Sequence, residues 1–431
     1  MKREEPKSVP IAVIGLGCMF PQAADREEYW ANIKNGVDAI TDIPASHWSA
    51  GDYFDSDPKK PDFTYAKRGG FLKPVDFDPG EFGIAPNALE ATDSAQLLGL
   101  VAAGMALRDA GYGPGRDFDR SRVSVVLGVT GTLELVVPLG ARLGHPIWRK
   151  ALAEAGIPRE QAEWIVERIK QGYVPWQESS FPGLLGNVVS GRIANRYNLG
   201  GTNCVVDAAC ASSLSALNLA GLELAARRAS MVVTGGVDCF NDIFMFMCFS
   251  KTPALSPSGD IRPFDAQGDG TMLGEGLGML VLKRLDEAER DGDRVYAVLK
   301  GLGSSSDGRG KSIYAPSAEG QTQALAAAYE HAGFGPETVE LVEAHGTGTT
   351  VGDAAEVRAL TEVFGKNAGG RSRWCALGSV KSMIGHTKAA SGAAGLIKTV
   401  LALHHKVLPP TIKVRRPIAD LAAPETPFYL N

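Results

Sequence analysis

The sequence predicts an α/β protein with buried sheets, and three observations support this fold class. Short apolar runs recur along the chain, beginning with VPIAVIGLG at 9–17 and VSVVLGV at 123–129. These runs are apolar throughout, as is typical of strands that are covered on both faces. Segments with the apolar spacing of helices lie between them, so strands and helices alternate from the start of the chain.

The N-terminal part of the chain establishes this alternation. A predicted helix from about Asp25 to Ile33 follows the first strand, and a glycine ends it. Residues 41–82 are rich in Asp, Pro, Gly and aromatic residues without a sustained period, so we expect a long structured loop there. The next predicted helix begins near Pro86 and ends around Gly111.

The rest of the chain continues the pattern on both sides of Cys210. TNCVVDAA predicts a strand that leads into Cys210, and the following helix has one stripe of apolar or small residues, Leu214, Leu217, Gly221 and Leu224. Further strands are predicted in MVVTGG, LGMLVLKRL, YAVLKGLG, VELVEAHG and WCALGSV, and further helices at 145–171, 182–196, 317–332, 352–364 and 388–404.

Composition excludes several classes of function. The 431 residues carry a net charge of -5, which gives no reason to expect nucleic acid or an anionic membrane as a partner. The six cysteines form no CxxC pair and no metal-ligand spacing, so we expect no metal site and a reducing, cytoplasmic location. The start, MKREEPKSVP, has no apolar run behind its charges, and no later stretch is long enough for a membrane helix.

The stretch VVDAACASSLSAL places Cys210 where a strand runs directly into a helix. Free backbone amides and the helix dipole favour the thiolate at that position, and could move the pKa of a thiol from about 8.5 toward about 7. The small residues on both sides indicate a sharp turn that another molecule can approach. We therefore predict a nucleophile, and the alternative is a small buried residue at a crowded turn.

Two further motifs each contribute a histidine. EAHGTGT places His345 after a strand, with glycines that allow close approach of a ligand and hydroxyls at Thr347 and Thr349. A core histidine that donates to a carbonyl is the alternative. GSVKSMIGHTKAASGAAGLIK places Lys381 five residues before His386, and a nearby cation disfavours the imidazolium and keeps the ring neutral. The Ala/Gly-rich helix behind it is expected to pack closely against another helix.

One cysteine and two histidines on glycine-flanked turns predict acyl transfer through a thioester, and a Cys/His hydrolase fits them equally well. The strand–turn–helix pattern of VVDAAC recurs in LVEAHG, which indicates two related halves. The motif GLGCMF after the first strand begins like a dinucleotide fingerprint, but Phe20 replaces its third glycine and argues against a cofactor there.

Several motifs, taken together and in order, resemble a known family. VPIAVIGLGCMFP, VVDAACASS, SPSGDIRPFDAQGDG, GEGLGMLVLKRL, EAHGTGT and GSVKSMIGHT are similar to the β-ketoacyl synthase domains of polyketide and fatty acid synthases. The resemblance implies a thiolase-like fold with two similar halves, about 1–270 and 271–431, in five α-β-α-β-α layers. It also implies a homodimer.

The resemblance implies a role for each catalytic candidate. Cys210 would accept an acyl chain from the phosphopantetheine of an acyl carrier protein, and its backbone amide would stabilise the oxyanion. His345 and His386 would donate hydrogen bonds to the malonyl thioester oxygen during decarboxylation, before the enolate attacks the acyl thioester. Lys381 would hold His386 in position and keep it neutral. The product is an acyl chain two carbons longer.

Further positions follow from the same resemblance. Thr347 and Thr349 would contact the pantetheine arm, and Phe249 in CFSKTPALS would contact the substrate. No cofactor would be bound by the chain itself, which would be fused to, or work with, acyltransferase and other synthase domains. Acyl carrier proteins are commonly acidic, so Lys67, Arg68 and Lys251 are candidates for a basic docking patch.

Within the family, DAACASS and CFSKTPALS look more like the iterative type I synthases than the modular ones. The enediyne polyketide synthases of antibiotic biosynthesis match best, and the polyunsaturated fatty acid synthases come next. Family members continue past the equivalent of PETPFYLN431 into a glycine-rich segment of the GFGGTNAH kind, so we expect the chain to be an excerpt of a longer enzyme. A thiolase-like or Cys/His acyl transferase or hydrolase and a non-catalytic dimer partner remain the alternatives.

Overall fold

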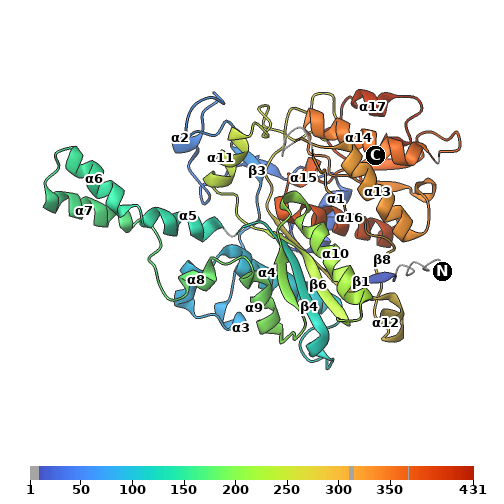
Figure 1. Cartoon of the computed structure of the whole chain (residues 1–431), viewed down its shortest axis with the longest axis horizontal. Helices are drawn as coiled ribbons and strands as arrows, with labels where there is room; N and C mark the ends of the chain where they lie inside the picture. The colour runs from blue at the N-terminus through green and yellow to red at the C-terminus, as the bar shows by residue number, and fades with distance from the viewer. Residues whose placement is uncertain (1–8, 132, 310–314, 367) are drawn as a thin grey trace.

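The computed structural model describes residues 9–131, 133–309, 315–366 and 368–431, so most of the charged N-terminal stretch considered above lies outside it. Its described part contains a six-stranded mixed sheet of order β5-β4-β6-β7-β1-β8, a three-stranded parallel sheet of order β11-β10-β9, and a two-stranded ribbon of β2 and β3. Helices lie between and around the sheets (Figure 1). None of the helices in the described ranges has the length and hydropathy needed to cross a bilayer.

The element bounds are as follows. The strands are β1 (Ile11–Met19), β2 (Ile40–Asp42), β3 (Arg68–Gly70), β4 (Val123–Val129), β5 (Asn203–Val206), β6 (Met231–Asp238), β7 (Gly276–Arg284), β8 (Ala297–Leu299), β9 (Leu341–Glu343), β10 (Cys375–Gly378) and β11 (Phe428–Leu430). The α-helices are α1 (Arg26–Lys34), α2 (Ala50–Tyr53), α3 (Pro79–Phe82), α4 (Ser94–Asp109), α5 (Leu133–Arg142), α6 (His145–Glu154), α7 (Arg159–Lys170), α8 (Ser180–Gly183), α9 (Val188–Tyr197), α10 (Ser212–Ala225), α11 (Ile243–Lys251), α12 (Leu285–Arg290), α13 (Ala318–Ala332), α14 (Thr350–Gly365), α15 (Lys381–Ile384), α16 (Ser391–His405) and α17 (Ala419–Ala422). The 3-10 helices are η1 (Pro86–Ala91), η2 (Arg120–Arg122), η3 (Ala209–Ala211), η4 (Pro336–Thr338) and η5 (Lys388–Ala390).

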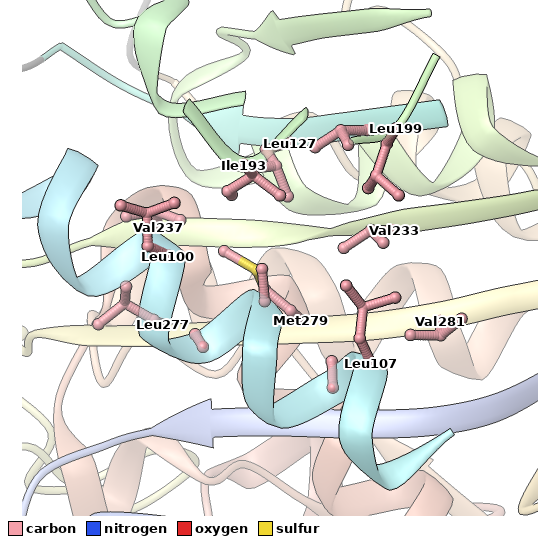
Figure 2. Close-up of a cluster of buried hydrophobic side chains, with 14 of the residues drawn as sticks. Leu100, Leu107, Leu127, Ile193, Leu199, Val233, Val237, Leu277, Met279 and Val281 are labelled. Carbon is pink, nitrogen blue, oxygen red and sulfur yellow. The ribbon is translucent and has the colours of Figure 1, made fainter. Parts of the chain in front are cut away.

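The inner strands of the large sheet are covered on both faces, as their apolar sequences predict. Every residue of β1, β4 and β7 is buried. On one face, α4 and α9 pack against the sheet, and Figure 2 shows Leu100 and Leu107 of α4 and Ile193 of α9 meeting Met279 of β7. On the other face lie α10 and α16. This burial is the main favourable contribution to the stability of the half that carries Cys210.

Glycines of the GLG motif in β1 allow α4 to pack closely. A Cβ at Gly15 would lie 2.5 Å from the carbonyl oxygen of Ala106, and one at Gly17 would lie 2.4 Å from that of Ala102. Both distances are shorter than van der Waals contact, so a side chain at either position would push the helix away from the strand. The motif therefore serves helix packing, in agreement with the argument against a dinucleotide site.

The helices α10 and α16 form a central layer between the two sheets. A Cβ at Gly392 of α16 would lie 2.5 Å from the Cγ of Leu214 of α10, and the amide of Ala393 donates to the Ser213 hydroxyl at 3.0 Å. This confirms that the Ala/Gly-rich helix packs closely against a neighbour. On the far side of the small sheet lies α14, whose apolar residues pack with β9, β10 and β11. The described chain thus has the α-β-α-β-α order of layers.

Several element predictions need correction. The long loop at 41–82 contains the short elements β2, α2, β3 and α3. The helix predicted from Pro86 to Gly111 divides into η1 and α4, because Thr92 is extended and Asp93 caps the new helix by accepting from the amide of Ala95. The segment 145–171 is two helices, α6 and α7, which extend from the body on α5 (Figure 1). Leu214, predicted on the buried stripe of α10, is 49% exposed.

Candidate active site

A sharp turn presents Cys210 between β5 and α10. The residue before it, Ala209, has φ +49°, a left-handed conformation that is uncommon for residues other than glycine. Hydroxyl groups hold this turn. Ser212 Oγ donates to the carbonyl of Ala209 at 2.7 Å and accepts from the amide of Ala208 at 2.9 Å, and Thr130 lies 3.1 Å from the same hydroxyl. The predicted turn is confirmed, and the first serine of CASS is needed to form it.

His345 lies in the loop after β9, and a partly buried carboxylate holds its backbone. Glu356 of α14 accepts the amides of His345 at 2.6 Å and Gly346 at 2.8 Å. Gly346 has φ +46°, and a Cβ there would lie 2.6 Å from the Cβ of Ser379. The glycine is therefore required by both its conformation and its neighbour. Burial raises the pKa of Glu356, while the two amides oppose that shift.

His386 lies between α15 and η5 and is 3% exposed. Its amide donates to the carbonyl of Met272 at 2.7 Å, and its carbonyl accepts from the amide of Gly274 at 2.9 Å. The amide of Lys388 donates to its Nδ1 at 3.0 Å. Because Nδ1 accepts this bond, the neutral ring must carry its proton on Nε2, which is then free to donate.

Lys381 contacts His345 and does not hold His386, which corrects the arrangement predicted from the sequence. Its Nζ lies 2.6 Å from the carbonyl oxygen of His345 and 3.5 Å from Nδ1 of the same ring. An ammonium facing Nδ1 also favours the proton on Nε2 of His345. The two imidazole rings are 5.2 Å apart between centroids and nearly perpendicular, at 87°. Two neutral N–H donors therefore lie side by side.

Electrostatics keep both rings neutral. Burial and the Lys381 ammonium, followed by His345 and Lys388, hold the pKa of His386 well below its usual range. The His345 side chain is exposed on one side, while protein surrounds it at longer range. This surrounding protein, together with Lys381, lowers the pKa of His345 to about 3. The exposed side reduces the desolvation that contributes to this lowered pKa.

Burial raises the pKa of Cys210, and the nearby Lys381 and Lys388 ammonium groups partly offset that rise. The helix terminus alone, which is visible in the sequence, predicts a lower pKa for this thiol. Desolvation outweighs the helix terminus here, so at neutral pH the group is a thiol. The Ser391 hydroxyl donates to the carbonyl of Cys210 at 3.3 Å, which joins the cysteine turn to the start of α16. Cys210, Lys381 and the segment after His386 thus belong to one site.

Comparison with known proteins identifies the family. Residues 8–288 match the family described as Beta-ketoacyl synthase, N-terminal domain, and residues 296–415 match Beta-ketoacyl synthase, C-terminal domain. The chain belongs to the β-ketoacyl synthase family. Members of this family form carbon–carbon bonds between acyl units, so the comparison confirms the predicted family and the predicted class of acyltransferase.

Relatives and solved structures agree with this assignment. The ketosynthase chain is 44% identical over 98% of its length to a polyunsaturated fatty acid synthase polypeptide of a Thraustochytrium species, and 36% identical over 96% to polyketide synthase GfsB of Streptomyces halstedii. It spans only 15% and 7% of those proteins. An oxazolomycin ketosynthase domain of Streptomyces albus superimposes with TM-score 0.83 at 30% identity, covering 97% of this chain and 67% of that one. A ketosynthase of the bacillaene synthase of Bacillus subtilis gives TM-score 0.81 at 33% identity, covering 98% and 66%. These structures confirm the thiolase-like fold.

The predicted substrate-binding residues of the ketosynthase occupy two places. Thr347 and Thr349 lie at the start of α14, in the same loop as His345, with their hydroxyls 2.8 Å apart. These two hydroxyls contact each other, and the contact of Thr347 and Thr349 with pantetheine stays a prediction. Phe249 of α11 packs against a separate hydrophobic cluster that includes Trp48 and Phe246. A role for Phe249 in substrate binding also stays a prediction.

The three cations predicted to dock a carrier protein differ in their surroundings. Lys251 lies at the end of α11, where Nζ donates to the carbonyl of Lys60 at 2.7 Å. Lys67 lies over the ring of Phe54. The hydroxyl of Thr64, close to Lys67 in the chain, forms a hydrogen bond with the hydroxyl of Ser250, which immediately precedes Lys251. The two lysines therefore lie in one region. Arg68, in contrast, donates to two backbone carbonyls and lies near a carboxylate. Its side chain remains 36% exposed, so a part for Arg68 in carrier-protein docking stays a prediction.

Sequence reasoning missed two groups of the ketosynthase site. The first group is Asp353, in the first turn of α14, and Glu356, in the second turn. Asp353 accepts from the amides of Gly348 at 3.1 Å and Phe264 at 2.7 Å. The spacing GTGTTVGDAAE, with acids in the first two turns of a helix, was the available signal. Lys388 was the second omission, since no sequence pattern shows what its side chain reaches.

Proposed function

We propose that this ketosynthase chain catalyses the decarboxylative Claisen condensation of a malonyl thioester with an acyl chain carried on Cys210. The observation that carries the proposal is the pair of neutral histidines, His345 and His386, with Nε2–H groups free beside a cysteine at a helix start. Two uncharged donors on neighbouring rings suit the oxygen of a thioester that becomes an enolate.

The proposed reaction balances in two stages. In the first, the sulfur of Cys210 attacks an acyl thioester, the bond to the pantetheine sulfur breaks, and the proton of the cysteine thiol passes to the departing thiol. In the second, the malonyl C–CO₂ bond breaks and its electron pair moves onto the thioester oxygen, which accepts from both histidines. The enolate carbon attacks the acyl carbonyl, the C–S bond to Cys210 breaks, and the Cys210 thiolate that leaves takes up one proton from solvent. The β-ketoacyl product is two carbons longer.

The protonation of the histidines argues against a Cys/His hydrolase. In such an enzyme the histidine accepts the thiol proton and later activates water, so its pKa must lie near the working pH. Here Nδ1 of each ring already has a donor facing it, and the pKa of each ring is lowered. Neutral rings of this kind donate hydrogen bonds well and accept protons poorly.

We propose an acyl carrier protein as the source of both substrates, docking near Lys67 and Lys251. The 44% identity to a polyunsaturated fatty acid synthase supports an iterative, polyene-forming synthase, and the enediyne type stays a prediction. The small share of the relatives that this chain spans supports its work alongside acyltransferase and other domains.

Lys67→Glu and Lys251→Glu should each slow acylation from the carrier protein at low salt, without slowing acylation from free acyl-pantetheine.

An uncovered face of α10 bears on the alternative of a non-catalytic dimer partner. Leu214, Leu219 and Leu222 are 49%, 40% and 59% exposed on a helix that otherwise forms the central layer. We propose that another part of the synthase assembly covers these residues. We also propose that the chain forms a homodimer. The edge strand β5 of the large sheet supports this, because its outer side pairs with no strand of the described chain.

The test is intact mass after exposure to an acyl-pantetheine thioester, with peptide mapping and Cys210→Ala. Cys248→Ala is the matched control, because Cys248 is a free and exposed thiol. One adduct that maps to Cys210 supports the proposal. An adduct that survives Cys210→Ala, or no adduct on a folded protein, overturns it and favours the non-catalytic role.

The condensation step has its own test. Release of carbon dioxide from malonyl-pantetheine should fall by about 10²- to 10³-fold in His386→Ala, as expected for loss of one oxyanion donor. A hydrolase would instead lose its acyl adduct to water without releasing carbon dioxide.

A further inference from the structure

Lys388 is a buried cation two residues after His386, and its side chain is fully engaged. It is 5% exposed. Its Nζ lies 2.7 Å from a carboxylate oxygen of Asp238 at the end of β6, donates to the amide oxygen of Asn241, and donates to the carbonyl of Gly274 at 3.2 Å. A buried charge is tolerated only with such partners, since leaving it unpaired costs several kcal/mol.

The backbone of Lys388 is in an unusual conformation that these contacts hold in place. Its φ is +42°, in the left-handed region that costs about 1–2 kcal/mol for a residue with a Cβ. Asp238 contacts both the side chain and the following backbone. One of its carboxylate oxygens binds Lys388 Nζ, and the other accepts from the amide of the next residue, Ala389, at 3.3 Å. The anchored side chain therefore favours a backbone shape that the residue would otherwise avoid.

That backbone shape determines the hydrogen bond to the His386 ring. It directs the amide of Lys388 at Nδ1, at 3.0 Å. Gly274 links the two residues a second time, since its amide donates to the carbonyl of His386 at 2.9 Å while its carbonyl accepts from Lys388 Nζ. Lys388 thus donates from its amide to Nδ1 of the His386 ring, and its side chain contacts Gly274, the residue that also binds the main chain of His386.

We propose that Lys388, anchored by Asp238 and Asn241, is a positioning residue that fixes His386 in its Nε2–H tautomer and aims that donor at the malonyl thioester oxygen. The inference rests on the proposed function for the identity of the substrate. It does not rest on it for the state of the ring, which can be measured without turnover. A merely structural ion pair would alter the stability of the fold and leave the tautomer unchanged.

The experiment compares three variants of the full chain. Lys388→Met removes the anchor, and Lys388→Arg retains a cation. The double variant Lys388→Met with Asp238→Asn removes both charges, so that no unpaired buried charge is left to prevent folding. The matched control is Lys283→Met with Asp293→Asn, because Lys283 and Asp293 form a buried pair of the same kind, 2.6 Å apart and 5% and 1% exposed, outside the site.

Two readouts are measured on each folded variant. The first is kcat and KM for malonyl-pantetheine decarboxylation, with the rate of Cys210 acylation measured separately. The second is the ¹⁵N NMR signature of the His386 ring, assigned by its disappearance in His386→Ala. It reports which nitrogen carries the proton.

If Lys388 positions His386, the double variant should lose about 10- to 100-fold in kcat for decarboxylation, with KM and Cys210 acylation changed much less. Its His386 signal should show a mixture of tautomers, whereas Lys388→Arg should restore part of the activity. The control pair should lower stability and leave kcat unchanged. A double variant with wild-type kcat and a pure Nε2–H signal would overturn the proposal. If the wild-type chain releases no carbon dioxide, the proposed function fails, and the NMR comparison alone still decides the role of Lys388.

Discussion

Replacing Lys398 with methionine should destabilise the protein through a carboxylate that is left unpaired next to the active site. Lys398 of α16 is buried, and its Nζ lies 2.6 Å from Glu343, whose side chain is 8% exposed at the end of β9. The other oxygen of Glu343 accepts the amide of Val380 at 2.6 Å. This pair therefore joins the helix to the strand that leads to His345 and to the residue that precedes Lys381.

The expected magnitude follows from this burial. Removing one partner of a buried ion pair typically costs about 3–5 kcal/mol, because the remaining charge is uncompensated. Glu343→Gln in the Lys398→Met background removes that charge, and the glutamine oxygen can still accept from Val380. Glu343→Gln alone should cost a similar amount, because it leaves the Lys398 ammonium unpaired. The double variant should lie within about 1 kcal/mol of the wild type, far below the sum of the two single variants, as expected for coupled residues. Lys366→Met is the control, because Lys366 and Glu362 are 66% and 53% exposed and their pair should contribute below about 1 kcal/mol.

Urea unfolding measures these differences. Far-ultraviolet circular dichroism and tryptophan fluorescence must give coincident transitions before free energies are compared, since a chain of this size can unfold in stages. A loss below about 1 kcal/mol in Lys398→Met would show that Glu343 is not desolvated in the way the contacts indicate. A double variant as unstable as the sum of the two single variants would show that the pair is not coupled.

Three other outcomes are expected. Alkylation of Cys210 by iodoacetamide should accelerate as pH rises through 9, and Lys381→Met should slow it several-fold at pH 8, because losing the ammonium raises the pKa of the thiol further; equal rates would contradict this. Gly128→Ala should abolish acylation of Cys210 and lower the melting temperature, since a Cβ there would lie 2.4 Å from the backbone of Ser212; a normally acylated variant would refute the close packing. Burial raises the pKa of Asp93 to about 7, so the native state holds a proton that the unfolded chain loses near pH 4, and stability should fall between pH 4 and 7 by on the order of 4 kcal/mol. Asp93→Asn, which keeps the helix cap, should remove the Asp93 share of that slope in urea melts measured across this range and leave the share of Asp353, whose pKa burial also raises to about 7; an unchanged slope would show that the Asp93 carboxyl is ionised throughout.

The fold was predictable where burial alone decides it. Strands such as β1 and β7 are apolar at every position because helices or sheets cover both faces, and this continuous pattern needs no partner to be recognised. Predictions failed where one residue redirects the chain. Asp93 starts a new helix within the segment predicted as a single helix, and no periodicity marks that change. Leu214 has the spacing of a buried residue, but its exposure depends on what lies above α10.

The structure brings the predicted candidate residues into one candidate site, and their contacts were less predictable than their places in the chain. Cys210, His345 and His386 each follow a strand in a turn rich in small residues, and that pattern is local. The partner of Lys381 was not local, because His345 reaches it from 36 positions away. The pKa of Cys210 was misjudged for the same reason. The helix start is visible in the sequence, whereas desolvation depends on residues brought together only by folding.

A site with no general base is consistent with the proposed first stage. Transfer of an acyl group from one sulfur to another consumes one thiol and releases one thiol, so the proton lost by Cys210 is taken up by the leaving group. The raised pKa of Cys210 and the lowered pKa values of His345 and His386 leave no pair in which a histidine would remove the thiol proton at neutral pH. Attack by water, in contrast, requires a general base that accepts a proton from the water as it attacks. In the proposed reaction, we infer that the cations Lys381 and Lys388 act in both stages, because their charge lowers the pKa of the His386 ring and partly offsets the raised pKa of the Cys210 thiol. Such an arrangement suits the proposed transfer of acyl groups between thiols and the proposed enolate, while giving water no assistance.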